Sequence, residues 1–241
     1  MEERRKRRTK RDIEESLNKA LIQLVKESGF QNLTVMDIVR KANIEPVVFY
    51  NRYNDLNEFI DEFVKKYDYW FSDIVKECGD IRDDRKLYVA IMENLFRSLK
   101  ENRLMQQLLK WELSSDNDIT RRTVGLREFH TIPPVNKYKE MFAGSPVAID
   151  AVSALIIGGI YYLVLHAGMS TFADIDINTE DGSKKISDAI AYLGDVFFSD
   201  ASSVNSGMLE MAEQMKKDGM KITSIAKYTG LPIDVIQNLY R

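Results

Sequence analysis

Cysteine and histidine are scarce in this sequence. Its 241 residues include one cysteine, Cys78, and two histidines, His130 and His166. A single cysteine excludes an internal disulfide framework and any zinc cluster built on cysteine, and two histidines leave little for a histidine metal site. Cys78 has no histidine near it in the sequence, and no glycine-rich phosphate loop is present. We therefore expect no metal, no cofactor and no enzymatic activity, in a reduced cytoplasmic protein.

Proline and glycine are also rare, at 5 and 12 residues, whereas 44% of the residues are hydrophobic. This composition excludes collagen-like and low-complexity chains and indicates a globular protein with a buried core. The most apolar window, residues 151–165, lies between Asp150 and His166 and is shorter than the roughly 20 residues that span a bilayer. We expect a buried helix there and no membrane contact.

Positive charge is concentrated at one end of the chain. Residues 1–52 hold 12 Lys and Arg against 8 Asp and Glu, whereas the rest of the chain holds 22 against 29. A basic end on an acidic body indicates that this end meets a polyanion. A solvated tail is the alternative interpretation of the charge run alone. The run lacks the apolar stretch that a signal peptide needs.

Apolar residues recur at helical spacing along nearly the whole chain, which predicts an all-α fold. A first helix should end at Gly29, and Thr34 is a natural N-cap for a short second helix. Asn43 tolerates a left-handed turn, Glu45 can accept as an N-cap, and Pro46 suits the first position of a third helix. Two short helices joined by such a turn make a helix-turn-helix, whose second helix would enter a DNA major groove. An ordinary helical corner is the alternative.

The remainder of the chain also reads as helices. Asp55 should cap a long helix that runs to about Glu77, and Ser145 and Pro146 should open the most apolar helix. A less regular stretch is expected through Arg127. The predicted later helices are 87–99, 104–113, 145–167 and 183–198.

The first 60 residues resemble the DNA-binding domain of the tetracycline-repressor (TetR) family. The resemblance is an ordered pattern of one helix end and two helices with their caps. Its residues are Gly29-Phe30, Leu33-Thr34-Val35, Ile38-Val39, Ala42, Ile44, Phe49-Tyr50, Tyr53, Asp55-Leu56 and Glu58-Phe59. The sequence departs from the family pattern at four positions. Asn43 stands where Gly is usual, and Glu45 stands where Ser or Thr is usual. Val47 replaces a small residue, and Leu56 replaces a Lys.

The resemblance implies a homodimeric transcriptional regulator, a repressor, that binds double-stranded DNA at a palindromic operator. A small-molecule effector of unknown identity would enter the C-terminal domain and release the DNA. By position, Thr34 and Tyr50 would contact phosphates, and Val47 and Asn51 would approach a thymine methyl group and an adenine. Basic candidates for backbone or minor-groove contacts are Arg8, Lys10, Arg11, Arg40, Lys41 and Arg52. The alternative function, motivated by Glu45 and Leu56, is a helical protein-interaction module that keeps the motif only as a scaffold.

The resemblance implies a DNA-binding domain (1–54) and a regulatory and dimerisation domain (55–200). A helical tail (201–241), which is unexpected for the family, follows them. The aromatic and amphipathic candidates for an effector pocket are Trp70, Phe96, Trp111, Tyr161, Tyr162 and His166. For each of them, core packing is the alternative role. The candidates for a dimer interface are Ile157, Gly158, Tyr161, Ile186, Ile190, Leu193 and Phe197. A core helix within a monomer is the alternative for that group.

The last forty residues repeat the spacing of the first motif. After an expected linker at 202–207 comes an amphipathic helix that ends near Gly219, and then a second apparent helix-turn-helix. Its apolar and turn positions match those of the first motif at a constant offset, with Gly230 in the place of Asn43. This tail has Asp234 and no base before Arg241 in its last helix. We therefore expect packing or protein contact there and not a second DNA site.

Overall fold

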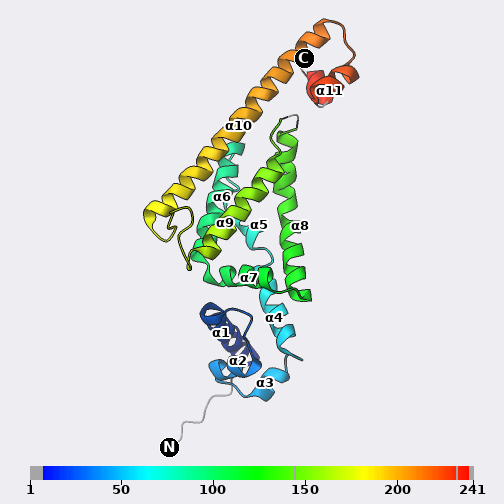
Figure 1. Ribbon diagram of the computed structural model, residues 1–241. Helices are drawn as coiled ribbons and strands as arrows, with labels where there is room; N and C mark the ends of the chain where they lie inside the picture. Colours follow the sequence, from blue (N-terminus) through cyan, green and yellow to red (C-terminus); the bar gives the residue numbers. More distant parts are fainter. Residues whose placement is uncertain (1–7, 144, 232, 239–241) are drawn as a thin grey trace, which may run out of the picture. The chain divides into compact units, whose positions relative to one another are not determined.

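The computed structural model describes residues 8–143, 145–231 and 233–238, and the side chains of all of these except 200–206, 234 and 238. The basic residues before Arg8 lie outside the described residues. Within the described part of the chain, all regular elements are helices, which confirms the all-α prediction (Figure 1). The helices in chain order are α1 (Lys10–Ser28), α2 (Val35–Ala42), α3 (Pro46–Tyr50), α4 (Leu56–Val64), the 3-10 helix η1 (Lys65–Tyr67), α5 (Trp70–Glu77), α6 (Asp84–Glu101), α7 (Arg103–Ser114), α8 (Asp118–Met141), α9 (Ile149–His166), α10 (Glu180–Lys217), α11 (Ile222–Thr229) and α12 (Ile233–Asn238).

The chain divides into two compact units. The first comprises Met1–Asp73 and Arg97–His130, and the second comprises Ile74–Phe96 and Thr131–Arg241. The first unit therefore contains α1 to α4, α7 and the beginning of α8. The second contains α9 to α12.

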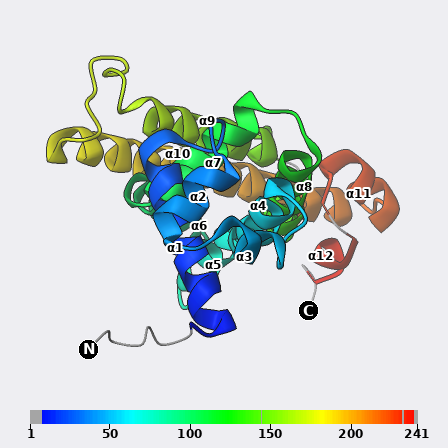
Figure 2. The same ribbon diagram turned by 90° about the horizontal axis from the view of Figure 1, so that it is seen from below.

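The N-terminal helices of the first unit close around one apolar core (Figure 2). Leu17 of α1, Ile38 of α2 and Phe49 of α3 are fully buried. The Phe49 ring meets the rings of Tyr53 and Phe59 at centroid distances of 5.3 and 5.5 Å. Because Phe59 belongs to α4, these aromatic contacts fix α3 against α4.

Helix α7 packs against the loop that joins α1 to α2. Trp111 is stacked on Phe30 at a centroid distance of 4.8 Å, and the side-chain amide of Gln31 donates to the hydroxyl of Ser114 at 2.7 Å. The three-helix head of the chain is thus part of a larger body that includes α7.

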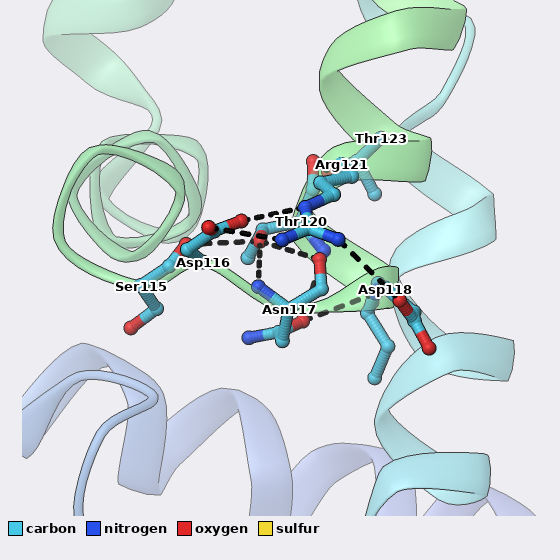
Figure 3. Close-up of polar contacts among 8 residues, drawn as sticks. Ser115, Asp116, Asn117, Asp118, Thr120, Arg121 and Thr123 are labelled. Carbon is cyan, nitrogen blue, oxygen red and sulfur yellow. Dashed lines mark hydrogen bonds and ion pairs between the residues drawn. The ribbon is translucent and has the colours of Figure 1, made fainter.

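A polar corner joins α7 to α8 (Figure 3). The side-chain oxygen of Asn117 accepts hydrogen bonds from the backbone of Ile119 and Thr120, both at 3.0 Å, which satisfies donors at the start of α8. The Thr120 hydroxyl donates to the Ser115 carbonyl at 2.9 Å. The corner is therefore ordered by its own side chains.

Helix α8 begins at Asp118 and continues through Pro133 and Pro134. The prediction of a less regular stretch through Arg127 is therefore wrong.

Helix α10 is one uninterrupted helix of 38 residues in the second unit (Figure 1). The linker predicted at 202–207 is therefore wrong. Ser, Asn and Gly each cost only about 1 kcal/mol or less relative to Ala inside a helix. The strongly helical segments on both sides outweigh that cost.

Two further boundaries differ from the sequence prediction. The helix predicted from Leu56 to Glu77 is broken into α4, η1 and α5. Helix α9 begins at Ile149, with Ala148 as its N-cap residue. Ser145 does not open that helix, because its hydroxyl instead accepts from the backbone of Val147 at 3.1 Å.

Candidate nucleic-acid interface

Local capping chemistry shapes the turn between α2 and α3. The hydroxyl of Thr34 accepts from the backbone N–H of Asp37 at 3.1 Å, so Thr34 is the predicted N-cap of α2. Asn43 adopts the left-handed conformation, with φ 52° and ψ 54°, and Pro46 occupies the first position of α3. Glu45 holds the N-cap position as predicted, but its side chain makes no capping hydrogen bond.

The outer face of α3 is exposed. The side chains of Val47 and Tyr50 are 62% and 56% exposed, and Asn51 follows them at the C-cap. Residues three and four apart in a helix share one face, so these three side chains form a single surface opposite the buried Phe49. Val48 is half-buried.

Arg8 binds the turn itself. Its guanidinium donates from Nη1 to the carbonyl oxygens of Ala42 and Asn43, at 3.2 and 3.1 Å. This contact joins the start of α1 to the end of α2, and no local sequence signal could have revealed it. The start of α1, the turn and α3 border a groove. Its lining residues are Arg8, Thr9, Lys10, Ile13, Asn43, Ile44, Glu45, Val48, Asn51 and Arg52.

Arg8 also contributes to the charge environment at the start of α1. The pKa of Asp12 lies below its ordinary value, chiefly because the backbone and side chain of Thr9 donate hydrogen bonds to its carboxylate. The charges of Arg8 and Arg11 act in the same direction. Asp12 thus stays ionised beside the positive end of the α1 dipole.

Four of the other predicted basic contacts have partners within the protein. Arg52 donates to the Val48 carbonyl at 2.8 Å, and Lys41 pairs with Glu27 at 3.1 Å. The remaining pairs are Arg40 with Asp37 at 3.5 Å and Arg11 with Glu15 at 3.1 Å. Exposed ion pairs contribute about 1 kcal/mol or less, so Arg11, Arg40 and Lys41 can exchange their partners for DNA phosphates.

The six candidate pocket residues fall into both units. Trp70 and Trp111 belong to the first unit, where Trp111 is stacked on Phe30. Phe96, Tyr161, Tyr162 and His166 belong to the second, where Phe96 is buried. The ring of Tyr162 stacks on that of His166 at a centroid distance of 5.1 Å, so the two side chains lie on one face of α9. Both of these rings also meet the ring of Phe172.

The candidate dimer residues lie on α9 and α10. On α9, Ile157 and Tyr161 are half-buried and Gly158 is exposed. The α10 members are Ile190, which is buried, and Ile186, Leu193 and Phe197, which are half-buried.

Helix α9 differs from the buried helix that the sequence predicts. It is long and apolar enough to cross a membrane, yet only 22% of its apolar window is buried. Leu155 is 77% exposed, and a Cβ atom added at Gly158 would meet nothing within 4 Å. The single chain therefore leaves part of this apolar helix exposed.

The tail forms the second helix-turn-helix that its spacing predicts. Gly230 is left-handed, with φ 71° and ψ −1°, as Asn43 is in the first motif. Ile225 and Ile236 are fully buried at the positions of Ile38 and Phe49. These two residues pack with Ala212 of α10 and Leu231 in a small core that is bordered by methionines.

The described residues contain no group of three or more His, Cys, Asp or Glu side chains placed to hold a metal ion.

No protein-family model matches the chain, and no curated protein matches it in sequence. Solved structures do match. A TetR family transcription regulator from Marinobacter aquaeolei VT8 is 19% identical, over 74% of this chain and 95% of that chain, with a TM-score of 0.53. FadR from Bacillus subtilis, in complex with stearoyl-CoA, is 12% identical over 75% and 96% of the two chains, with a TM-score of 0.57. FadR from Bacillus halodurans, a fatty acid degradation regulator, is 14% identical over 77% and 97%, with a TM-score of 0.55. The chain therefore has the fold of TetR-family transcriptional regulators.

Proposed function

We propose that this chain is a TetR-family DNA-binding transcriptional regulator, and a repressor, that acts in the cytoplasm. One observation carries the proposal: Val47, Tyr50 and Asn51 form an exposed surface on α3, while Phe49 anchors the same helix in the core. A second helix held in this way is the element that helix-turn-helix proteins insert into the major groove. The solved structures of similar fold are regulators and not enzymes.

Phosphate contacts in this proposal come from groups around the turn. Thr34 would offer its hydroxyl at the N-terminus of α2, and Tyr50 would donate its phenol to a second phosphate. The cations available for phosphates and the minor groove are Arg8, Lys10, Arg11, Arg40, Lys41 and Arg52. Residues 1–54 thus serve as the DNA-binding domain.

A homodimer would cover the exposed apolar face of α9. Leu155 and Gly158 leave space for close approach by a second copy of the helix, and α10 would complete the interface with Ile186, Leu193 and Phe197. A large exposed apolar surface is typical of a protein-interaction site. Residues 55–200 would then combine dimerisation with effector binding, and the tail (201–241) would serve packing or protein contact.

A small-molecule effector would bind the regulatory domain and release the DNA. The B. subtilis neighbour holds stearoyl-CoA, so this compound is the first to test here. The candidate residues in the second unit are Phe96, Tyr161, Tyr162 and His166, and those in the first are Trp70 and Trp111.

Selection of bound duplexes from a random pool tests the proposal. We expect enrichment of a motif with two inverted half-sites, and weaker capture when an effector is present. If no duplex were enriched, a protein-interaction module that keeps the motif as a scaffold would replace this function. Recovery of a protein partner without DNA would favour the same alternative.

A further inference from the structure

The exposed surface of α3 carries an unusual set of side chains for a DNA-recognition helix. From Glu45 to Asn51 the chain contains no Arg or Lys. The arginines that flank this segment in space, Arg8 and Arg52, donate to main-chain carbonyls of the turn and of α3. The surface therefore offers an isopropyl group at Val47, a phenol at Tyr50 and an amide at Asn51.

Base edges in the major groove differ in what they require of such a surface. Guanine presents two acceptors, N7 and O6, and is usually read by Arg or Lys. Thymine presents a methyl group, which an apolar side chain contacts, and adenine presents an amino donor beside an acceptor, which Asn satisfies. The exposed side chains of α3 therefore match an A·T pair and include no cation that could bind guanine.

Glu45 adds a repulsive element. Its carboxylate is exposed and makes no capping hydrogen bond to α3. An ionised carboxylate can only accept hydrogen bonds, so it is repelled by the two acceptors of guanine and attracted to the amino group of adenine or cytosine. Specificity often depends on such an unfavourable contact with the wrong partner.

We infer that α3 selects an A·T base pair at Val47 and Asn51, with Val47 packed on a thymine methyl group, and that Glu45 discriminates against a guanine edge at a separate position. This inference rests on the proposed function, because it names the bases that the same surface reads. The selectivity comes from methyl and amino groups, and the cations of this domain serve the phosphates.

Replacement of thymine by deoxyuridine tests the methyl contact. The substitution removes only the C5-methyl group and keeps the base pair. In the duplex selected by the full-length protein, we expect deoxyuridine at one thymine of one half-site to weaken binding about fourfold, the value of one buried methyl group. In the Val47→Ala variant, the same substitution should have no effect.

Met36→Ala is the matched control, because Met36 is also an exposed apolar side chain of this domain, 54% exposed on α2. It should keep the full sensitivity to deoxyuridine. Glu45→Gln should admit guanine at a half-site position where the unchanged protein excludes it, as read from a second selection.

The outcomes separate the two claims. Enriched duplexes that bind equally well with deoxyuridine at every thymine would overturn this inference and leave the proposed function standing. A selected motif with guanine edges opposite α3 would do the same. Failure to enrich any duplex would overturn the proposed function and this inference together.

Discussion

Arg121 and Arg122 are neighbours in the sequence, but their guanidinium groups lie in different surroundings. Arg121 pairs with Asp116 on the surface, and its side chain is 67% exposed. Arg122 pairs with Asp61 at 2.9 Å and with Asp68 at 2.8 Å, where the Asp68 side chain is only 8% exposed. Arg122 therefore ties α8 to α4 and to the segment after η1, across 61 and 54 residues of sequence.

Removal of the Arg122 guanidinium should destabilise the fold. Arg122→Met leaves the buried Asp68 carboxylate without its cation, and we expect a loss of about 2 kcal/mol in the free energy of unfolding. Arg121→Met removes an exposed pair and should change the free energy of unfolding much less. Urea denaturation of both variants measures the difference. Equal effects of the two substitutions would show that Arg122 has no special structural role.

The same ion pairs predict a pH dependence of stability. Burial acts against the charged form of Asp61, but hydrogen bonds from Lys65 and Arg122 and their charges outweigh it and hold the pKa of Asp61 below its ordinary value. A carboxyl whose pKa is lower in the folded state stabilises the protein above the unfolded pKa, and this stability is lost as the pH falls through the folded pKa. We expect the free energy of unfolding to fall below about pH 5, and to fall less steeply in Arg122→Met. Parallel curves for the two proteins, from urea denaturation at several pH values, would contradict this account.

Among the elements, short helices with local caps were predictable, whereas the full extents of α8 and α10 were not. Thr34, Asn43, Pro46 and Asp55 each act on backbone groups within a few residues, so the sequence alone indicates where α2, α3 and α4 begin or end. The continuity of α10 through 202–207 depends on the helical segments on both sides of it. Weak local preferences are outweighed at such positions, and the sequence pattern misplaced a linker there.

The tail offers a test at the scale of the turn. Gly230 is left-handed, so Gly230→Val places a β-branched side chain where it is strained by roughly 1–2 kcal/mol. We expect faster hydrogen exchange at Ile225 and across α11, with α1 to α3 unaffected. Gly230→Asn is the control and should preserve protection, because Asn43 adopts this conformation in the first motif. Unchanged exchange in the valine variant would contradict the assigned turn.

At the scale of the whole molecule, the helix-turn-helix could be predicted because its residues lie within one short segment. The contact of Arg8 with the turn could not, because it joins residues 34 and 35 positions apart. The exposure of α9 could not be predicted either. Its composition fits a core helix, and only the packing of the rest of the chain leaves Leu155 uncovered.

That exposed face predicts an effect on assembly. Leu155→Glu places a charge on the apolar surface of α9, and we expect a dimer to dissociate to a monomer, which halves the mass measured by sedimentation equilibrium. Leu113→Glu is the matched control, because Leu113 is 79% exposed on α7 and lies outside the proposed interface. An unchanged mass for Leu155→Glu, or dissociation in both variants, would contradict the proposed interface.

The central claim is that the exposed face of α3 reads DNA, and the specificity ratio tests it most directly. This ratio compares the affinity for the selected duplex with that for a scrambled duplex of equal length, in one salt concentration. We expect a ratio of roughly a thousand or more for the unchanged protein. For the double variant Val47→Ala/Asn51→Ala, the ratio should fall by at least tenfold, while binding to the scrambled duplex and the unfolding midpoint stay the same. A ratio near one for the unchanged protein, or an undiminished ratio in the double variant, would contradict the account.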